Sequence, residues 1–345
     1  MSIKKLIHIA IVVSLVLVMS GCSTLDMMVG LKDENKQLEI YNDDFAFIDD
    51  DISDEEVVDT ITINSDQQMR NVIAYYKDAN NLLVPVKAEI PWEEGIAKAT
   101  LRKMVIGDAI EIELSHSGLK GVLPEGTEIL GMSIEDGLCI VDFNSNILNT
   151  TSMEEEKLMM TALAYTLTEF DTIDRVEIVV DGQEMQVLTF GYPVDVAFER
   201  ENINLVGSED GANYTVYYKT PETEVAGFYV PFTFTADTVD NPVKVVMDKL
   251  FNGPPEELVV QNEIPYGITL NSVSLNQGVA DLDLSMGALN LKQEDYEELN
   301  KIVVLCLQQF GEISEVNYSI EGITFEEAGL NIEDSEVKAV FNNFK

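Results

Sequence analysis

The residues that support nucleophilic catalysis are scarce in this sequence. Its two histidines are His8, which lies in an apolar N-terminal stretch, and His116. A Ser-His-Asp or Cys-His arrangement would have to use His116 as its base. The flanking Ser115 and Ser117 are too near in sequence to indicate such an arrangement, and no nucleophile-elbow pattern is present. We therefore expect His116 on a surface loop, and the number of histidines excludes a zinc site built from them.

Acidic side chains are abundant, so paired carboxylates are the remaining route to catalysis. Asp142 and Asp283 stand out because they occupy corresponding places in two similar stretches of sequence, each after a pair of strands. Such an acid acts as a general acid or base only beside a partner carboxylate in a cleft. An aspartate that accepts hydrogen bonds from loop amides explains more simply why both stretches carry it. We predict that the chain is not an enzyme; conversion of peptidoglycan by these aspartates is the alternative.

Metal and cofactor motifs are also incomplete. The segment 281–285 (DLDLS) resembles the opening of an EF-hand loop, but Gly287 falls at the seventh place instead of the sixth. Lys292 stands at the twelfth place, where a bidentate glutamate is needed. Phosphate-loop and dinucleotide fingerprints are absent from the sequence. The sequence therefore predicts no cofactor and no firm metal site, although weak calcium binding stays open for Asp49, Asp50, Asp51 and Asp54.

The charge balance excludes some partners. The chain has 62 acidic and 21 basic residues, which gives a net charge of −41. Such a surface repels phosphate groups, so binding to nucleic acid or directly to anionic headgroups is not expected. It keeps the protein soluble, and it can also attract basic partners or divalent cations.

The N-terminus has the order of a secretory signal. Lys4 and Lys5 precede an apolar stretch of about 14 residues, shorter than the ~20 residues that span a bilayer. The stretch closes at Met19-Ser20-Gly21-Cys22, which resembles the lipobox of bacterial lipoproteins, with methionine where leucine is usual. We expect a signal peptide at residues 1–21 and fatty acid, such as palmitate, on Cys22, which anchors the chain to the outer face of the cell membrane.

A tether follows at residues 22–66. Between Asp43 and Asp59 it has nine acidic residues and no basic one. Charge repulsion extends such a segment, and a flexible coil of this length spans roughly 35 to 40 Å. We expect it to hold the folded part away from the membrane.

Beyond the tether the sequence repeats itself. Tyr75-Tyr76-Lys77 recurs as Tyr217-Tyr218-Lys219, an offset of 142 residues, and later matches lie at offsets of 146 and then 141. The fall from 146 to 141 places a five-residue insertion in the first copy, between Gly107 and Pro124. Both copies share a helical face with the spacing i, i+3, i+4, i+7, i+11. Its members are Met159, Ala162, Leu163, Thr166 and Phe170, and in the second copy Leu299, Ile302, Val303, Cys306 and Phe310.

Each copy is predicted to run strand, strand, helix, strand, strand, helix, strand. This order is typical of an α+β fold, with two tandem two-layer repeats that each contain a small, mostly antiparallel sheet and two helices. We place the first domain at residues 67–203, a linker at 204–213, the second domain at 214–330 and a C-terminal tail at 331–345. Cys306 lies on the apolar helical face, so we expect it to be a small buried residue, and with Cys139 it makes no disulfide framework.

Paired tyrosines mark the start of both copies. Adjacent residues of a strand point to opposite faces. We therefore expect one tyrosine of each pair to pack in the core and the other to be exposed. This makes Tyr75, Tyr76, Tyr217 and Tyr218 the candidate interface residues. Core or edge packing is the expectation for Trp92.

The order of these motifs resembles the GerM family of sporulation and spore germination proteins. The resemblance rests on the strand pair that ends at Asp142, the segment Leu123-Pro124-Glu125-Gly126, and the helix that ends at residues 166–170 before Asp181-Gly182. It recurs in the second copy, covers about residues 66–330, and lies behind a lipobox, as in the lipoproteins of this family. It implies domains similar to the ring-building domains of secretion-type complexes. It also implies a scaffolding role in the channel complex between mother cell and forespore.

We therefore expect a lipid-anchored, extracytoplasmic scaffold or interaction protein. Its partners would be the membrane, through Cys22, and envelope proteins or further copies of itself, through the two repeats. Nucleic acid is not among them. The alternative is an extracytoplasmic binding module for cell-wall material or calcium.

Overall fold

The computed structural model describes residues 69–91, 95–208, 210–222, 227–236, 240–332 and 342–343. The expected signal peptide, Cys22, the expected tether with its aspartates, and Trp92 lie outside these residues. Within the described ranges, none of the helices has the length and apolar character needed to cross a membrane.

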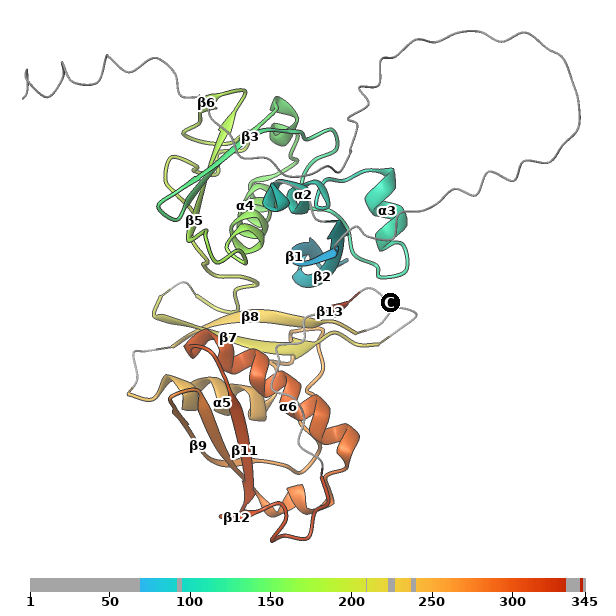
Figure 1. Ribbon diagram of the computed structural model, residues 1–345, viewed down its shortest axis with the longest axis vertical. Coiled ribbons are helices and arrows are strands. Elements are labelled where there is room, and N and C mark those ends of the chain that lie inside the picture. Colours follow the sequence, from blue (N-terminus) through green and yellow to red (C-terminus); the bar gives the residue numbers. More distant parts are fainter. Residues whose placement is uncertain are drawn as a thin grey trace, which may run out of the picture. The chain divides into compact units, whose positions relative to one another are not determined.

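The first repeat begins with a hairpin and continues with a sheet that lies beside a long helix (Figure 1). Its elements are β1 (Met69–Lys77), β2 (Leu83–Pro91), α2 (Ile96–Arg102), α3 (Asp108–Leu114), β3 (Ile129–Glu135), β4 (Leu138–Phe143), the 3-10 helix η1 (Ser145–Leu148), α4 (Met153–Leu167), β5 (Arg175–Val180) and β6 (Gln183–Glu184). The helix α3 lies in the segment where the sequence predicted an insertion.

The second repeat has the same order without the inserted helix. Its elements are β7 (Ala212–Lys219), β8 (Tyr229–Ala236), α5 (Pro242–Asn252), β9 (Leu270–Asn276), β10 (Val279–Leu284), the 3-10 helix η2 (Met286–Asn290), α6 (Gln293–Leu307), the 3-10 helix η3 (Gln308–Phe310), β11 (Glu315–Ile320) and β12 (Ile323–Thr324). A short strand β13 (Asn342–Asn343) follows. The predicted α+β class and tandem repeat are confirmed.

The strands of each repeat are divided between two sheets. The hairpin β1-β2 is separate from the sheet β3-β4-β5-β6, and β7-β8 is likewise separate from β12-β11-β10-β9. The pairs β4/β5 and β10/β11 are parallel, so each needs a crossover connection, and α4 and α6 supply it. Because α4 contacts both β1 and β5, it lies between the hairpin and the sheet and keeps them apart.

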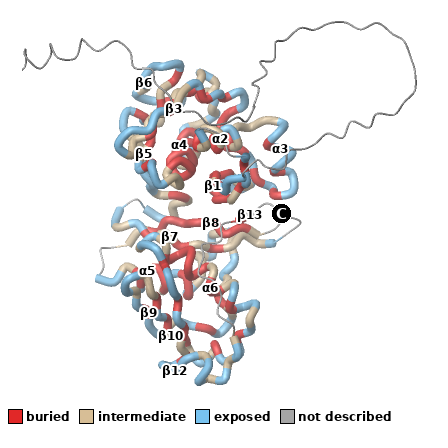
Figure 2. Tube along the Cα trace, in the orientation of Figure 1, coloured by how far each residue is buried: buried red, intermediate tan, exposed pale blue. Residues whose placement is uncertain are grey.

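The long helix of each repeat forms the centre of the core. The first four positions of the predicted helical face are fully buried in both copies, and Figure 2 shows α4 and α6 as largely buried. The fifth positions, Phe170 and Phe310, are half-buried. Ser152 caps α4 by accepting a hydrogen bond from the Glu155 amide at 3.2 Å, which satisfies one of the free donors at the helix N-terminus.

Two residues of the expected C-terminal tail take part in the fold. Asn342 and Asn343 form β13, which pairs in parallel with β2 of the first repeat, and Asn342 is buried. Two polar residues carry no periodic pattern, so the sequence offered no signal for this strand.

Candidate functional site

The paired tyrosines are not exposed as predicted. Tyr75, Tyr76 and Tyr218 are buried to within 1% of full burial, and Tyr217 is half-buried. The two tyrosines of each pair do point to opposite faces. The prediction of an exposed partner was wrong, because Tyr75 packs 5.3 Å from the Tyr165 ring of its own repeat and shares with Tyr217 a pocket that both repeats line.

Tyr75 and Tyr217 meet in a pocket between the repeats. This pocket, of about 540 Å³, is lined by Tyr75, Tyr165, Glu169 and Arg200 from the first repeat and by Tyr217 and Gln309 from the second. Tyr218 points the other way and donates hydrogen bonds to the carbonyl oxygens of Lys249 and Gly253.

An equivalent contact ties each hairpin to its long helix. The Tyr75 amide donates to Thr166 Oγ1 at 3.1 Å, and the Tyr217 amide donates to Cys306 Sγ at 3.2 Å. The threonine-to-cysteine difference between the copies therefore preserves a hydrogen bond. Burial raises the pKa of the Cys306 thiol to about 12, which keeps it protonated and unreactive at neutral pH.

The pocket between the repeats contains different polar groups on its two sides. Glu169 accepts from the Tyr75 hydroxyl at 3.0 Å and pairs with Arg200 at 2.7 Å, while Arg200 lies 5.2 Å above the Tyr165 ring. Burial, and then the charge of Glu169, raise the pKa of Tyr75. On the other side, Gln309 accepts from the Thr215 amide at 2.9 Å and donates to its carbonyl at 2.7 Å.

Asp142 and Asp283 hold turns. Asp142 Oδ1 accepts from the Gly182 amide at 2.9 Å, and Asp283 Oδ1 accepts from the Gly322 amide at 2.7 Å. Asp283 also accepts from Ser319 Oγ at 2.6 Å, and these two donors hold its pKa below the ordinary value. The contacts are those of aspartates that stabilise the turn after the last parallel strand of each repeat.

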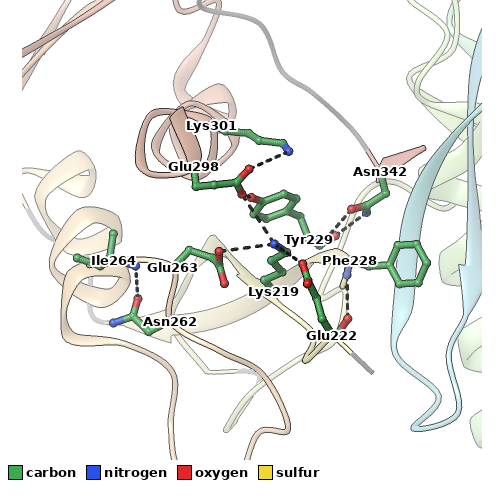
Figure 3. Close-up of polar contacts among 11 residues, drawn as sticks. Lys219, Glu222, Phe228, Tyr229, Asn262, Glu263, Ile264, Glu298, Lys301 and Asn342 are labelled. Atoms are coloured by element: carbon green, nitrogen blue, oxygen red, sulfur yellow. Dashed lines mark hydrogen bonds and ion pairs between the residues drawn. The ribbon is translucent and has the colours of Figure 1, made fainter. Parts of the chain in front are cut away.

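A charged cluster that sequence reasoning missed surrounds Lys219 in the second repeat (Figure 3). Its ammonium lies 3.1 Å from Glu222, 3.7 Å from Glu263 and 3.9 Å from Glu298. The Tyr229 hydroxyl donates to Glu298, and Lys301 lies 3.8 Å from the same carboxylate. The repeated Lys77 and Lys219 were the available signal, but the three glutamates come from separate elements.

Burial and charge shift the pKa values in this cluster. Burial alone would lower the pKa of Lys219, but the hydrogen bond to Glu222 and the nearby carboxylates outweigh it and raise the pKa. Burial raises the pKa of Glu263 against the opposing effect of Lys219. Burial and the hydrogen bond to Glu298 raise the pKa of Tyr229.

An acidic pocket of about 650 Å³ adjoins the Lys219 cluster. Glu263, Glu294, Asp295 and Glu298 contribute to its wall, and the fully exposed Tyr266 lies at its edge. Among the described residues, no three His, Cys, Asp or Glu side chains converge as metal ligands would. The pocket is therefore a negatively charged surface depression, suited to a cationic group of a larger molecule.

Three other residues of the described ranges have side chains that the sequence singled out as reactive: His116, Cys139 and Cys306. His116 is exposed in the turn after α3. Cys139 is buried, and burial raises the pKa of its thiol to about 11. Both Cys139 and Cys306 are free thiols.

Comparison with known proteins shows what the chain is similar to. The family model described as Germane, of sporulation and spore germination, matches residues 73–186 and 215–326. The chain is 26% identical over 277 residues to the spore germination protein GerM of Bacillus subtilis (strain 168), across 76% of this chain and 75% of that protein. Its fold is similar to the solved tandem GerMN domains of the sporulation protein GerM from Bacillus subtilis, with a TM-score of 0.69, 23% identity, and coverage of 81% of this chain and 100% of that one.

These findings confirm the resemblance that the motifs indicated. The family model matches both repeats, and its two matches together cover well over half of the sequence. The chain belongs to the Germane family of sporulation and spore germination proteins.

Proposed function

We propose that the chain is a non-enzymatic, lipid-anchored scaffold that works outside the cytoplasm in an envelope assembly of sporulation or spore germination. The observation that carries this proposal is the match of both repeats to one sporulation and germination family. The name of the Bacillus subtilis relative, a spore germination protein, supports the same process. The placement of the reactive residues supports a binding role, because Asp142 and Asp283 are occupied with turn amides.

The first repeat offers a surface for a protein partner at the edge strand β3. Among the described strands, β3 pairs with β4 alone, and its Leu130 and Ile134 are 49% and 45% exposed. The corresponding edge strand of the second repeat, β9, has Asn271 in place of Leu130 and no large apolar residue that is exposed. An edge strand with exposed apolar side chains is a favourable place for a partner to add a strand. We assign the partner contact to β3.

The anchor can be tested by replacing Cys22. The variant Cys22→Ala is expected to move from the membrane fraction to the soluble fraction, because at ~0.8 kcal/mol per buried CH₂ the acyl chains supply the binding. Cell fractionation followed by immunoblotting measures this, with Cys139→Ala as the control that keeps Cys22. Retention of Cys22→Ala in the membrane fraction would contradict the anchor.

The partner surface can be tested by crosslinking in intact cells followed by pull-down. We expect Leu130→Glu and Ile134→Glu to reduce the captured envelope partner by about tenfold or more, because a charge is placed where a strand would dock. Val259→Glu is the matched control, since Val259 is 63% exposed and lies outside both sheets. An unchanged yield from both β3 variants would remove β3 as the contact surface.

Deletion of the gene tests the scaffold role itself. Normal spores and unchanged envelope complexes after the deletion would overturn it.

A second function, binding of cell-wall material, is favoured by the acidic pocket beside Tyr266. Glu294 and Asp295 in its wall, beside the two glutamates that pair with Lys219, suit an amino group of a wall peptide. Calorimetry of the full chain with soluble wall fragments and with Ca²⁺ separates this function from the scaffold. Heat with wall fragments that is lost in Glu294→Gln supports the pocket, and absence of heat with either ligand leaves the scaffold.

A further inference from the structure

Two asparagine side chains bridge the hairpins of the two repeats. Asn204 Oδ1 accepts from the Leu83 amide at 2.8 Å. Its Nδ2 donates to the carbonyl of Leu83 at 2.9 Å and to that of Pro231 at 2.8 Å. One side chain therefore binds β2 of the first repeat and β8 of the second.

Asn342 makes the three equivalent hydrogen bonds, with the roles of the two repeats exchanged. Its Oδ1 accepts from the Tyr229 amide at 2.7 Å, as Figure 3 shows. Its Nδ2 donates to the carbonyl of Tyr229 at 2.8 Å and to that of Pro85 at 2.7 Å. Leu83 corresponds to Tyr229, and Pro85 corresponds to Pro231, at the repeat offset of 146. The two asparagines are thus reciprocal.

The backbone next to each asparagine also forms hydrogen bonds with the hairpin of the other repeat. After the first repeat, Ile203 and Val206 exchange backbone hydrogen bonds with Thr233, both at 2.9 Å, and Val206 pairs in parallel with Phe234 of β8. After the second repeat, β13 pairs in parallel with β2, and Asn342 lies opposite Val86. Each repeat therefore extends its C-terminal segment onto the hairpin of the other.

Asparagine suits this position chemically. Pro85 and Pro231 have no amide hydrogen, so β2 and β8 cannot form a regular ladder with each other at these residues. Their carbonyls still need donors. The asparagine amide group supplies two donors and an acceptor in one plane, whereas aspartate would supply acceptors only.

We propose that Asn204 and Asn342 form a pair of reciprocal clamps that couple the two repeats into one unit. Asn342 and Asn343 of the expected C-terminal tail then stabilise the hairpin of the first repeat. Loss of either clamp should destabilise both hairpins. This includes the hairpin of the repeat that the substituted asparagine does not follow in sequence.

Hydrogen–deuterium exchange of the full chain tests the clamps. In Asn342→Ala we expect the amides of both the 229–231 and the 83–88 peptides to exchange about tenfold faster, because the variant removes hydrogen bonds to both strands. Asn204→Ala should give the same result in the same two peptides, and it tests the proposal if Asn342→Ala does not fold. Asn342→Asp removes the donors to the Tyr229 and Pro85 carbonyls but keeps the acceptor for the Tyr229 amide, so its faster exchange should be larger in the β2 peptide.

Asn290→Ala is the matched control, because Asn290 is exposed at the end of η2 and far in sequence from both hairpins. It should leave both peptides unchanged. Faster exchange confined to the hairpin of the repeat that precedes the substituted asparagine, or no change in either peptide, would overturn the coupling.

Discussion

Replacing Glu156 with alanine is expected to lower the free energy of unfolding by about 2–4 kcal/mol, because it removes the acceptor of several hydrogen bonds inside the protein. Glu156 is completely buried in α4. Its carboxylate accepts from the amides of Phe190 and Tyr192, at 2.7 and 3.1 Å, and from Thr150 Oγ1 at 3.1 Å. Alanine would remove the acceptor of all three hydrogen bonds. Urea denaturation followed by circular dichroism measures the loss.

Two further variants separate the loss of the buried hydrogen bonds from the loss of an acidic residue in the first turn of the helix. Glu156→Gln keeps the shape and one acceptor oxygen, so we expect it to lose less stability than Glu156→Ala. Glu154→Ala changes an exposed acid in the same first turn, and it should leave the denaturation midpoint nearly unchanged. If Glu156→Ala and Glu154→Ala had similar midpoints, the buried network would not stabilise the fold.

Leu163→Ala is expected to lower the free energy of unfolding by about 2–5 kcal/mol, because it opens a cavity in a packed core. Leu163 is completely buried on α4, the helix that contacts both β1 and β5. Val303 is its counterpart on α6 and is also completely buried, but it is smaller, so Val303→Ala should cost less. The same denaturation experiment measures both. A change below about 1 kcal/mol for Leu163→Ala would mean that the site collapses around the missing atoms.

The sequence predicted the parts of the fold that depend on local periodicity. The helical face that includes Leu163 and Val303 was readable from its 3.6-residue spacing, and the turns at Gly137 and Gly278 from their flanking strands. The division of each repeat into two sheets was not readable, because it depends on where the long helix packs. The strand β13 was missed because two residues are too few to show a pattern.

The predictions for the site divide in the same way. Asp142 and Asp283 were found because the repeat itself singles them out, and their contacts are local to one sheet. The burial of Tyr75 could not be predicted, since the side chains around it, such as Tyr165 and Tyr217, are about 90 or more residues away in sequence. Bonds such as Asn342 to Pro85 join residues 257 apart in sequence, and no local signal exists for them.

The reciprocal clamps have the form of an isologous interface, in which residue i touches j and j touches i, as in a twofold-symmetric dimer. Here both halves belong to one polypeptide. A contact between two separate chains weakens on dilution, but a linker fixes the effective concentration of the halves, roughly in the millimolar range for a short one. The fused pair is therefore independent of protein concentration. The two halves of one chain can also differ in sequence, as Glu169 and Gln309 do at equivalent positions. Two identical subunits carry the same residue at every equivalent position.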